Sequence, residues 1–77
     1  MNAIPFCDAK FEKIYKIFEI KSTDKKLKNR LENFGFLNGE KIQLLKYNYK
    51  KSAVMVKVMG ANFVLDESVL KMIFVYE

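Results

Sequence analysis

The chain has 77 residues, of which 51% are hydrophobic and 30% are charged, a balance typical of one small globular domain. It has no histidine and one cysteine, which excludes an intrachain disulfide, zinc sites of the Cys/His type and histidine-based catalysis. Fourteen basic and nine acidic residues give a net charge of +5, which favours acidic partners or simply keeps an aromatic-rich protein soluble.

The N-terminal segment lacks the basic and apolar regions of a secretory signal. No stretch approaches the roughly 20 apolar residues of a membrane span, so we expect a cytoplasmic protein without direct membrane insertion. The single cysteine, Cys7, is expected to be a small buried or half-buried thiol rather than a bridge between chains.

The first third of the chain is predicted to be extended. Pro5 fixes its own φ and pushes Ile4 toward extended geometry, so residues 4–10 are expected to form an edge segment or a lead-in. Residues 11–20 are ambiguous, because their apolar positions fit a helical face as well as a strand. Three isoleucines and three aromatic residues in ten favour a strand, which we predict here.

A helix is predicted over residues 24–34, with Thr23 or Asp24 as its N-cap. Leu27, Leu31 and Phe34 share one face of this helix, and we expect that face to pack against the sheet. The outside of the helix is basic and carries Lys25, Lys26, Lys28 and Arg30.

Gly35 follows the helix, where a left-handed residue can end it at little steric cost. Phe36 then falls where a Schellman cap places an apolar contact, which we expect to be made with Leu31. Asn38-Gly39 is a turn signal that precedes a strand. We therefore treat Leu27, Leu31, Gly35, Phe36 and Gly39 as one structural motif.

A β-hairpin is predicted from strands at residues 40–49 and 53–59. The polar turn between them carries Lys50-Lys51 at its tip. In the second strand, alternation predicts that the valines face one side. The residues expected on that side are Val54, Val56 and Val58, and those on the other are Met55, Lys57 and Met59.

The C-terminal part is predicted to contain a turn at residues 60–62, a short strand at 63–65 and a final strand at 73–76. Asp66 is the candidate cap of a single helical turn, whose Val69 and Leu70 would plug one end of the sheet. About five short strands around one core predict a mainly β, partly open barrel, with residues 1–77 as a single domain.

The central motif resembles a known family. Arg30-Leu31, Gly35-Phe36 and Gly39 are similar to the FeoA pattern Arg-Leu-x-x-x-Gly-Leu-x-x-Gly. Residues 64–75 are similar to the family's ending, a short strand followed by one helical turn and Ile-x-Val. The resemblance covers residues 4–75 and implies an SH3-like barrel with a helix inserted after the first long strand.

The chain departs from the family pattern at three places. Asp66 stands where the family commonly has arginine, and Leu70 stands where it has alanine. The usual glycine before the first long strand is missing near Ala9-Lys10-Phe11. The change at Asp66 reverses a charge on a surface that could contact a partner.

The basic side chains are the candidate partner-binding residues. Arg30 is either a solvated charge at the helix end or an anchor for an acidic partner. The candidates on the hairpin are Lys46, Lys50, Lys51 and Lys57. With Tyr47 and Tyr49 among them they resemble a single-strand nucleic-acid surface. We prefer the alternative of a soluble hairpin whose tyrosines pack into the barrel.

No metal, cofactor or catalytic site is predicted. Asp66 and Glu67 are adjacent in the sequence, and adjacent side chains rarely face one metal. Without histidine a dedicated iron carrier is not expected. No nucleophile–base pair, phosphate loop or separated carboxylate pair is present, so we interpret the chain as a non-enzyme.

Three functions follow for testing. The resemblance implies an accessory protein of bacterial ferrous iron transport that docks on the cytoplasmic GTP-binding part of the membrane iron transporter. The alternative is a basic barrel that binds single-stranded nucleic acid. A third is a regulatory barrel similar to the domain appended to iron-responsive repressors, which we disfavour because we expect the chain to be complete without a DNA-binding domain. Edge strands with Met55 and Met59 also allow weak self-association.

Overall fold

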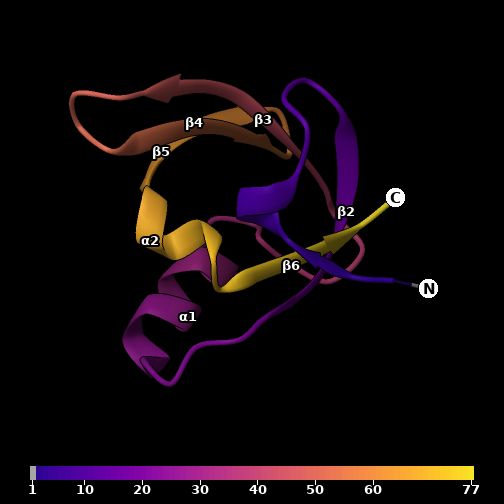
Figure 1. Ribbon diagram of the computed structural model, residues 1–77. Helices are drawn as coiled ribbons and strands as arrows, with labels where there is room; N and C mark the ends of the chain where they lie inside the picture. The colour runs from indigo at the N-terminus through magenta and orange to yellow at the C-terminus, as the bar shows by residue number, and fades with distance from the viewer. Residues whose placement is uncertain (1) are drawn as a thin grey trace.

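The computed structural model of the protein describes residues 2–77 and contains one antiparallel sheet whose strand order is β1-β6-β2-β3-β4-β5 (Figure 1). The strands are β1 (Ile4–Pro5), β2 (Ile14–Ile20), β3 (Lys41–Asn48), β4 (Ala53–Val58), β5 (Ala61–Asp66) and β6 (Ile73–Tyr76). The helical segments are η1 (Phe6–Asp8), α1 (Lys25–Asn33) and α2 (Glu67–Leu70). The mainly β prediction is confirmed, with one strand more than expected because residues 4–5 pair with β6.

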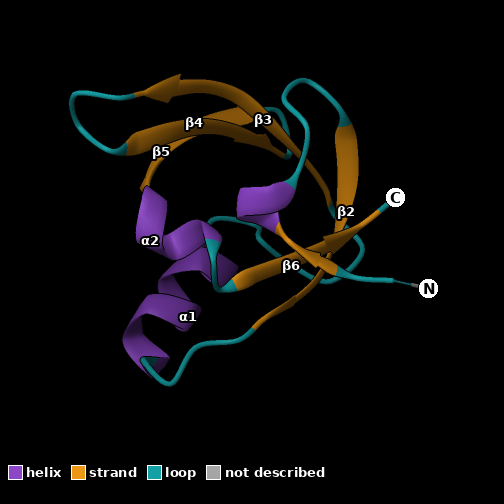
Figure 2. Ribbon diagram, in the orientation of Figure 1, coloured by secondary structure: helices purple, strands orange, loops and turns teal. Residues whose placement is uncertain are grey.

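The core lies inside the curve of the sheet, where η1 and α2 are also found (Figure 2). Phe6 of η1 is fully buried, and Val69 and Leu70 of α2 join it as predicted. From the sheet, the core receives Tyr15, Ile17, Ile20, Ile42, Leu44, Val54, Val56, Val58, Leu65, Ile73 and Val75. Because a sheet this small is covered on one face only, its outward side chains remain free to form a site. Within the described chain, no helix has the length and apolar character to span a membrane.

The predicted helix and both of its caps are confirmed. Asp24 is the N-cap, and its carboxylate accepts hydrogen bonds from the N–H groups of Lys26 and Leu27 at 3.0 and 3.2 Å. At the other end Gly35 adopts a φ of +102°. The N–H of Phe36 donates to the carbonyl of Leu31 at 3.0 Å, which is the long bond of a Schellman motif.

Phe34 packs against the sheet as predicted, but at its surface instead of in the core. Leu31 is buried and Leu27 is half-buried against the core, but Phe34 is 44% exposed. Phe34 is the C-cap residue, where the chain already turns away from the helical face. Its ring stacks on Phe63 of β5, with centroids 5.1 Å apart.

The first long strand begins later than predicted. Residues 11–13 form a turn in which Glu12 has a φ of +66°, and the Glu12 N–H donates to the Leu44 carbonyl. Phe11 is therefore 51% exposed instead of contributing to the sheet. A bulge at Phe18 shifts the pairing with β6, so Ile17 and Ile20 both face the core although they differ in parity.

The hairpin of β3 and β4 is confirmed, with Val54, Val56 and Val58 buried. A bulge at Leu45 changes the parity of β3, so that Ile42, Leu44 and Tyr47 all pack toward the core. Asn48 stabilises the turn, because its side-chain oxygen accepts hydrogen bonds from the N–H groups of Lys50 and Lys51.

The turn after β4 and the N-cap of α2 both differ from the prediction. The turn after β4 consists of Met59 and Gly60 alone, with φ values of +51° and +78°, as in a two-residue type I′ hairpin. β5 therefore starts at Ala61 instead of residue 63. Asp66 occupies the N-cap position of α2, but its side chain makes no capping hydrogen bond.

Candidate functional site

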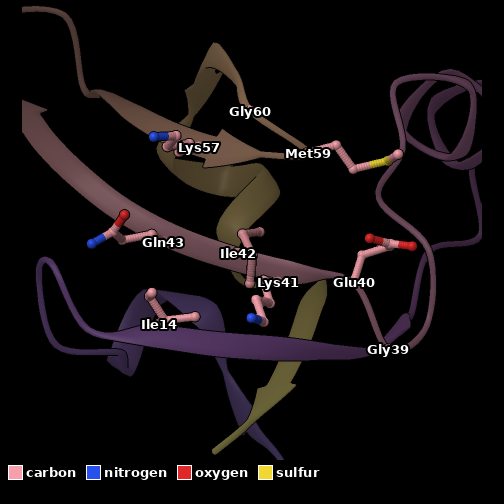
Figure 3. A pocket seen from close by; sticks show the side chains of 9 residues that line it. All are labelled: Ile14, Gly39, Glu40, Lys41, Ile42, Gln43, Lys57, Met59 and Gly60. Carbon is pink, nitrogen blue, oxygen red and sulfur yellow. The ribbon is translucent and has the colours of Figure 1, made fainter.

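A groove of about 410 Å³ lies on the outer side of the sheet, where β2, β3 and β4 run side by side (Figure 3). Its apolar walls are Ile14 of β2 and Met59 of the β4–β5 turn, which are 56% and 64% exposed. The other lining residues are Gly39, Glu40, Lys41, Ile42, Gln43, Lys57 and Gly60. Two large apolar side chains that remain exposed beside a groove mark a candidate contact surface.

Met59 connects the groove to the predicted central motif. Its side chain points away from β4 toward the chain that follows α1 (Figure 3). A Cβ built on Gly35 would lie 2.6 Å from the Met59 sulfur, so the absence of a side chain at Gly35 makes room for Met59. The helix stop thus also positions the apolar wall of the groove.

The Asn38-Gly39 turn, whose Gly39 lines the groove, is hydrogen-bonded to β2. The Gly39 N–H donates to the Ile17 carbonyl at 2.7 Å, and the Ile17 N–H donates to the Glu40 carbonyl at 2.9 Å. The Asn38 amide donates to the Phe18 carbonyl at 2.7 Å, which satisfies the bulged residue. The turn and the bulge therefore hold each other in place.

The groove carries a net positive charge. Lys41 and Lys57 line it, together with the half-buried Glu40. Among residues 2–77, the ion pairs within 4 Å join Lys13 to Glu77 and Lys21 to Glu19, and neither groove lysine takes part in them. The groove therefore combines apolar surface with lysines available to an acidic partner.

The five predicted partner-binding residues do not form one cluster. Lys57 lies in the groove, whereas Lys46 and Lys51 line a second hollow of about 260 Å³ on the β3–β4 hairpin. Lys50 is exposed at the hairpin tip, and Arg30 is exposed on the last turn of α1. Their role in binding stays a prediction.

Sequence reasoning missed Ile14, Lys41 and Met59 as site residues. Met59 and Lys57 did carry a signal, because both were expected on the outer side of their strand. Ile14 carried none, because its parity relative to the core depends on how β2 pairs with β3. The predicted structural motif is placed as expected, with Leu31, Gly35 and Phe36 buried and Gly39 at the turn.

The hairpin tyrosines pack on one another. The ring centroids of Tyr47 and Tyr49 are 4.4 Å apart in an edge-to-face arrangement. The Tyr47 hydroxyl donates to a Glu67 carboxylate oxygen at 2.7 Å, and this bond, more than burial, raises the pKa of Tyr47. Tyr47 packs against the core as the preferred alternative predicted, whereas Tyr49 is 84% exposed and does not.

The remaining polar candidates are surface groups. Cys7 is exposed, which corrects the prediction of a buried or half-buried thiol, because η1 turns only Phe6 inward. Partial burial, and then the neighbouring Asp8, raise the pKa of Cys7. In the part of the chain that the structure describes, no three Cys, Asp or Glu side chains gather where they could hold a metal ion. Glu67 instead holds Tyr47.

Sequence comparison identifies related proteins. The model of the FeoA domain family matches residues 4–77. A protein of Helicobacter pylori named Fe(2+) transport protein A is 40% identical over 47 residues. That match covers 61% of this chain and 62% of the H. pylori protein, so it spans less than two thirds of this relative.

Solved structures share the fold at low sequence identity. FeoA of Chlorobium tepidum has a TM-score of 0.86 at 15% identity and covers 95% of this chain and 69% of its own. FeoA of Stenotrophomonas maltophilia, described as an SH3 domain protein and solved with zinc, has a TM-score of 0.81 at 17% identity, covering 94% of this chain and 88% of its own. A manganese-dependent transcriptional repressor has a TM-score of 0.85 at 13% identity, but only 41% of that repressor is covered. The predicted SH3-like architecture is confirmed by these likenesses.

Proposed function

Because this chain belongs to the FeoA domain family, we propose that it is a non-enzymatic accessory protein of bacterial ferrous iron transport. It acts in the cytoplasm by docking on the GTP-binding part of the membrane iron transporter. The relative named for Fe(2+) transport supports the transport assignment, and the docking step goes beyond it.

The observation that carries the proposal is the groove between Ile14 and Met59. A partner that covers its apolar walls removes them from unfavourable contact with water, which stabilises the complex by roughly 25 cal/mol per Å² of apolar surface buried. Lys41 and Lys57 then favour a partner segment that places a carboxylate beside its apolar side chain. Such a surface is suited to recognition rather than to catalysis.

The test is a titration of isotope-labelled protein with the soluble GTP-binding region of the transporter from the same organism. We expect backbone amide shifts concentrated at the groove, around Ile14, Lys41 and Met59. Shifts confined to Arg30 or to the hairpin tip would move the docking site there. An absence of shifts with the transporter region, combined with shifts caused by a short oligonucleotide, would replace the proposal by nucleic-acid binding.

A variant pair tests the groove directly. Met59→Asn removes the apolar wall while keeping a residue that tolerates positive φ, so the turn is retained. We expect it to weaken docking by about tenfold, the effect of roughly 1.4 kcal/mol at a buried contact. Val64→Thr is the matched control, because Val64 is equally exposed but lies on β5 outside the groove. Equal affinity of wild type and Met59→Asn would contradict docking at this groove.

A further inference from the structure

The two edges of the sheet differ in their protection. β1, at one edge, has two residues and contains Pro5, both of which discourage pairing with another chain. β5, at the other edge, has six residues, pairs with β4 without a bulge and contains no proline. Val64 at its middle is 67% exposed. β5 is therefore an unprotected edge with an apolar centre.

The hydrogen-bond pattern fixes which groups of β5 are free. The Glu67 N–H donates to the Ser52 carbonyl at 2.9 Å, just beyond the last residue pair of the β4–β5 ladder. Hydrogen-bonded pairs alternate along an antiparallel ladder, so Leu65 and every second residue before it bond to β4. The intervening residues direct their backbone N–H and C=O groups away from the sheet. These are Asn62, Val64 and Asp66.

We propose that this edge binds a second copy of the chain, with the two β5 strands antiparallel around a twofold axis at Val64. In this register Val64 lies opposite Val64 of the second copy, and Asn62 lies opposite Asp66 of that copy. The three free residues of each strand then form about six backbone hydrogen bonds, two for each pair. The contact is isologous and closes as a dimer, because both copies use the same edge.

The side chains around this edge are complementary to themselves. Val64 pairs with Met55 on β4, so the centre of the joined sheet would be a continuous apolar row. Asn62 pairs with Lys57. The row on each side of the apolar row would therefore contain Lys57 and Asn62 of one copy and Asp66 of the second copy. A lysine side chain reaches across the two strand spacings of about 10 Å toward that carboxylate. The register thus places opposite charges together on both sides of an apolar centre.

This inference goes beyond the proposed docking function and is centred on a different element, although Lys57 belongs to both surfaces. The transporter groove is closed by Ile14 and Met59, whereas the pairing edge is centred on Val64. A single edge strand buries less surface than a standard interface, so we expect a dimer that forms with increasing concentration. Loss of self-association would therefore leave transporter docking to be judged separately.

The first experiment measures mass and amide exchange as functions of protein concentration. Sedimentation should show a monomer–dimer equilibrium as the full chain is raised toward about 1 mM. Hydrogen exchange should slow with concentration at the amides of Asn62, Val64 and Asp66. The amides of Phe63 and Leu65 should not change, since β4 already protects them. A monomer at every concentration, or slowed exchange at another surface, would overturn the proposal.

Variants then test the register. Val64→Pro removes an outward N–H that the monomer does not use, and proline is tolerated on an edge strand. Asp66→Lys reverses a charge that makes no capping bond in α2, so folding should be retained. We expect either change to raise the dissociation constant of the dimer at least about tenfold.

The double variant K57D/D66K is the decisive member of the set, because it restores opposite charges in the proposed register. It should return the dissociation constant to within about threefold of wild type. Asp8→Lys on η1 is the control for net charge, because it raises the charge by two as Asp66→Lys does, and it should leave the dimer intact. Dimerisation that is unaffected by V64P and by D66K would rule out this pairing. A double variant that dimerises as weakly as D66K alone would also rule it out.

Discussion

Gly35 meets two requirements at one residue. Its φ of +102° lies in the region that L side chains rarely adopt, and its missing Cβ leaves room for the Met59 sulfur. Gly39 meets only the first requirement, because its φ is +90° and nothing lies within 4 Å of a built Cβ. The two glycines therefore form a natural comparison between backbone strain and side-chain contact.

Gly35→Ala and Gly39→Ala should each destabilise the fold by about 1–3 kcal/mol, since both force a residue with a Cβ into a strained conformation. The exposed Met59 side chain can swing away from a new methyl group, so the contact itself should add little to the cost. Only Gly35→Ala should move the Met59 methyl resonance. Denaturant unfolding and methyl NMR measure the two effects, and an unmoved methyl in Gly35→Ala would refute the contact.

Tyr47 provides a pH-dependent contact. Its hydroxyl proton is held by Glu67, so its pKa in the folded state is raised above the ordinary value of 10.0. Stability from this bond is fully present below the pKa of the unfolded state and is lost as the pH rises through the higher folded value. Glu67→Gln should lower the pKa of Tyr47, as seen by ultraviolet titration of tyrosinate. Tyr49→Phe is the control, and it should leave the raised pKa of Tyr47 in place.

At the scale of elements, α1 is defined by its ends. Asp24 accepts two backbone N–H groups, and Gly35 and Phe36 close the other end with the Schellman bonds. Only Leu31 on its length is fully buried, so the short helix depends on these local caps more than a deeply packed helix would.

Asp24→Ala should therefore destabilise the protein by about 1 kcal/mol, because two N–H groups of the first turn lose their acceptor. Thr23→Ala is the matched control, since Thr23 is the neighbouring cap candidate and its side chain does not cap the helix. Circular dichroism during thermal unfolding would measure both. Equal losses from the two substitutions would contradict Asp24 as the cap.

At the scale of the whole molecule, stability rests on one core, and the candidate contact surface lies on the uncovered face of the same sheet. Ile73 is fully buried, whereas Ile14 is 56% exposed in the groove. The same residue type thus serves the interior at one position and the candidate contact surface at another. The division follows from a sheet that curves around η1 and α2 and leaves its outer side open.

Ile73→Ala should cost about 2–5 kcal/mol, since it removes buried methyl groups and leaves a cavity. Ile14→Ala should cost less than about 1 kcal/mol, limited to strand propensity at a solvated position. The order of the two should reverse in transporter binding by the folded variants, because Ile14→Ala alters the groove and Ile73→Ala leaves the groove residues in place. Urea unfolding ranks the two variants by stability, and the binding titration ranks them by affinity for the transporter. Equal unfolding midpoints would refute the assignment of the core.

The sequence by itself determined what depends on near neighbours in the chain. The cap at Asp24, the glycine stop and the valine face of β4 each follow from contacts a few residues apart, and the FeoA pattern rests on the same residues. The tertiary structure decided what depends on distant partners. The bulges at Phe18 and Leu45 reverse the parity of their strands, and Phe18 is held by Asn38, which is twenty residues away. Because a one-residue shift turns every following side chain to the other face, no local pattern could show that Ile17 and Ile20 both face the core. Ile14 reaches the groove through the pairing of β2 with β3, and Phe34 stays at the surface as the C-cap of α1.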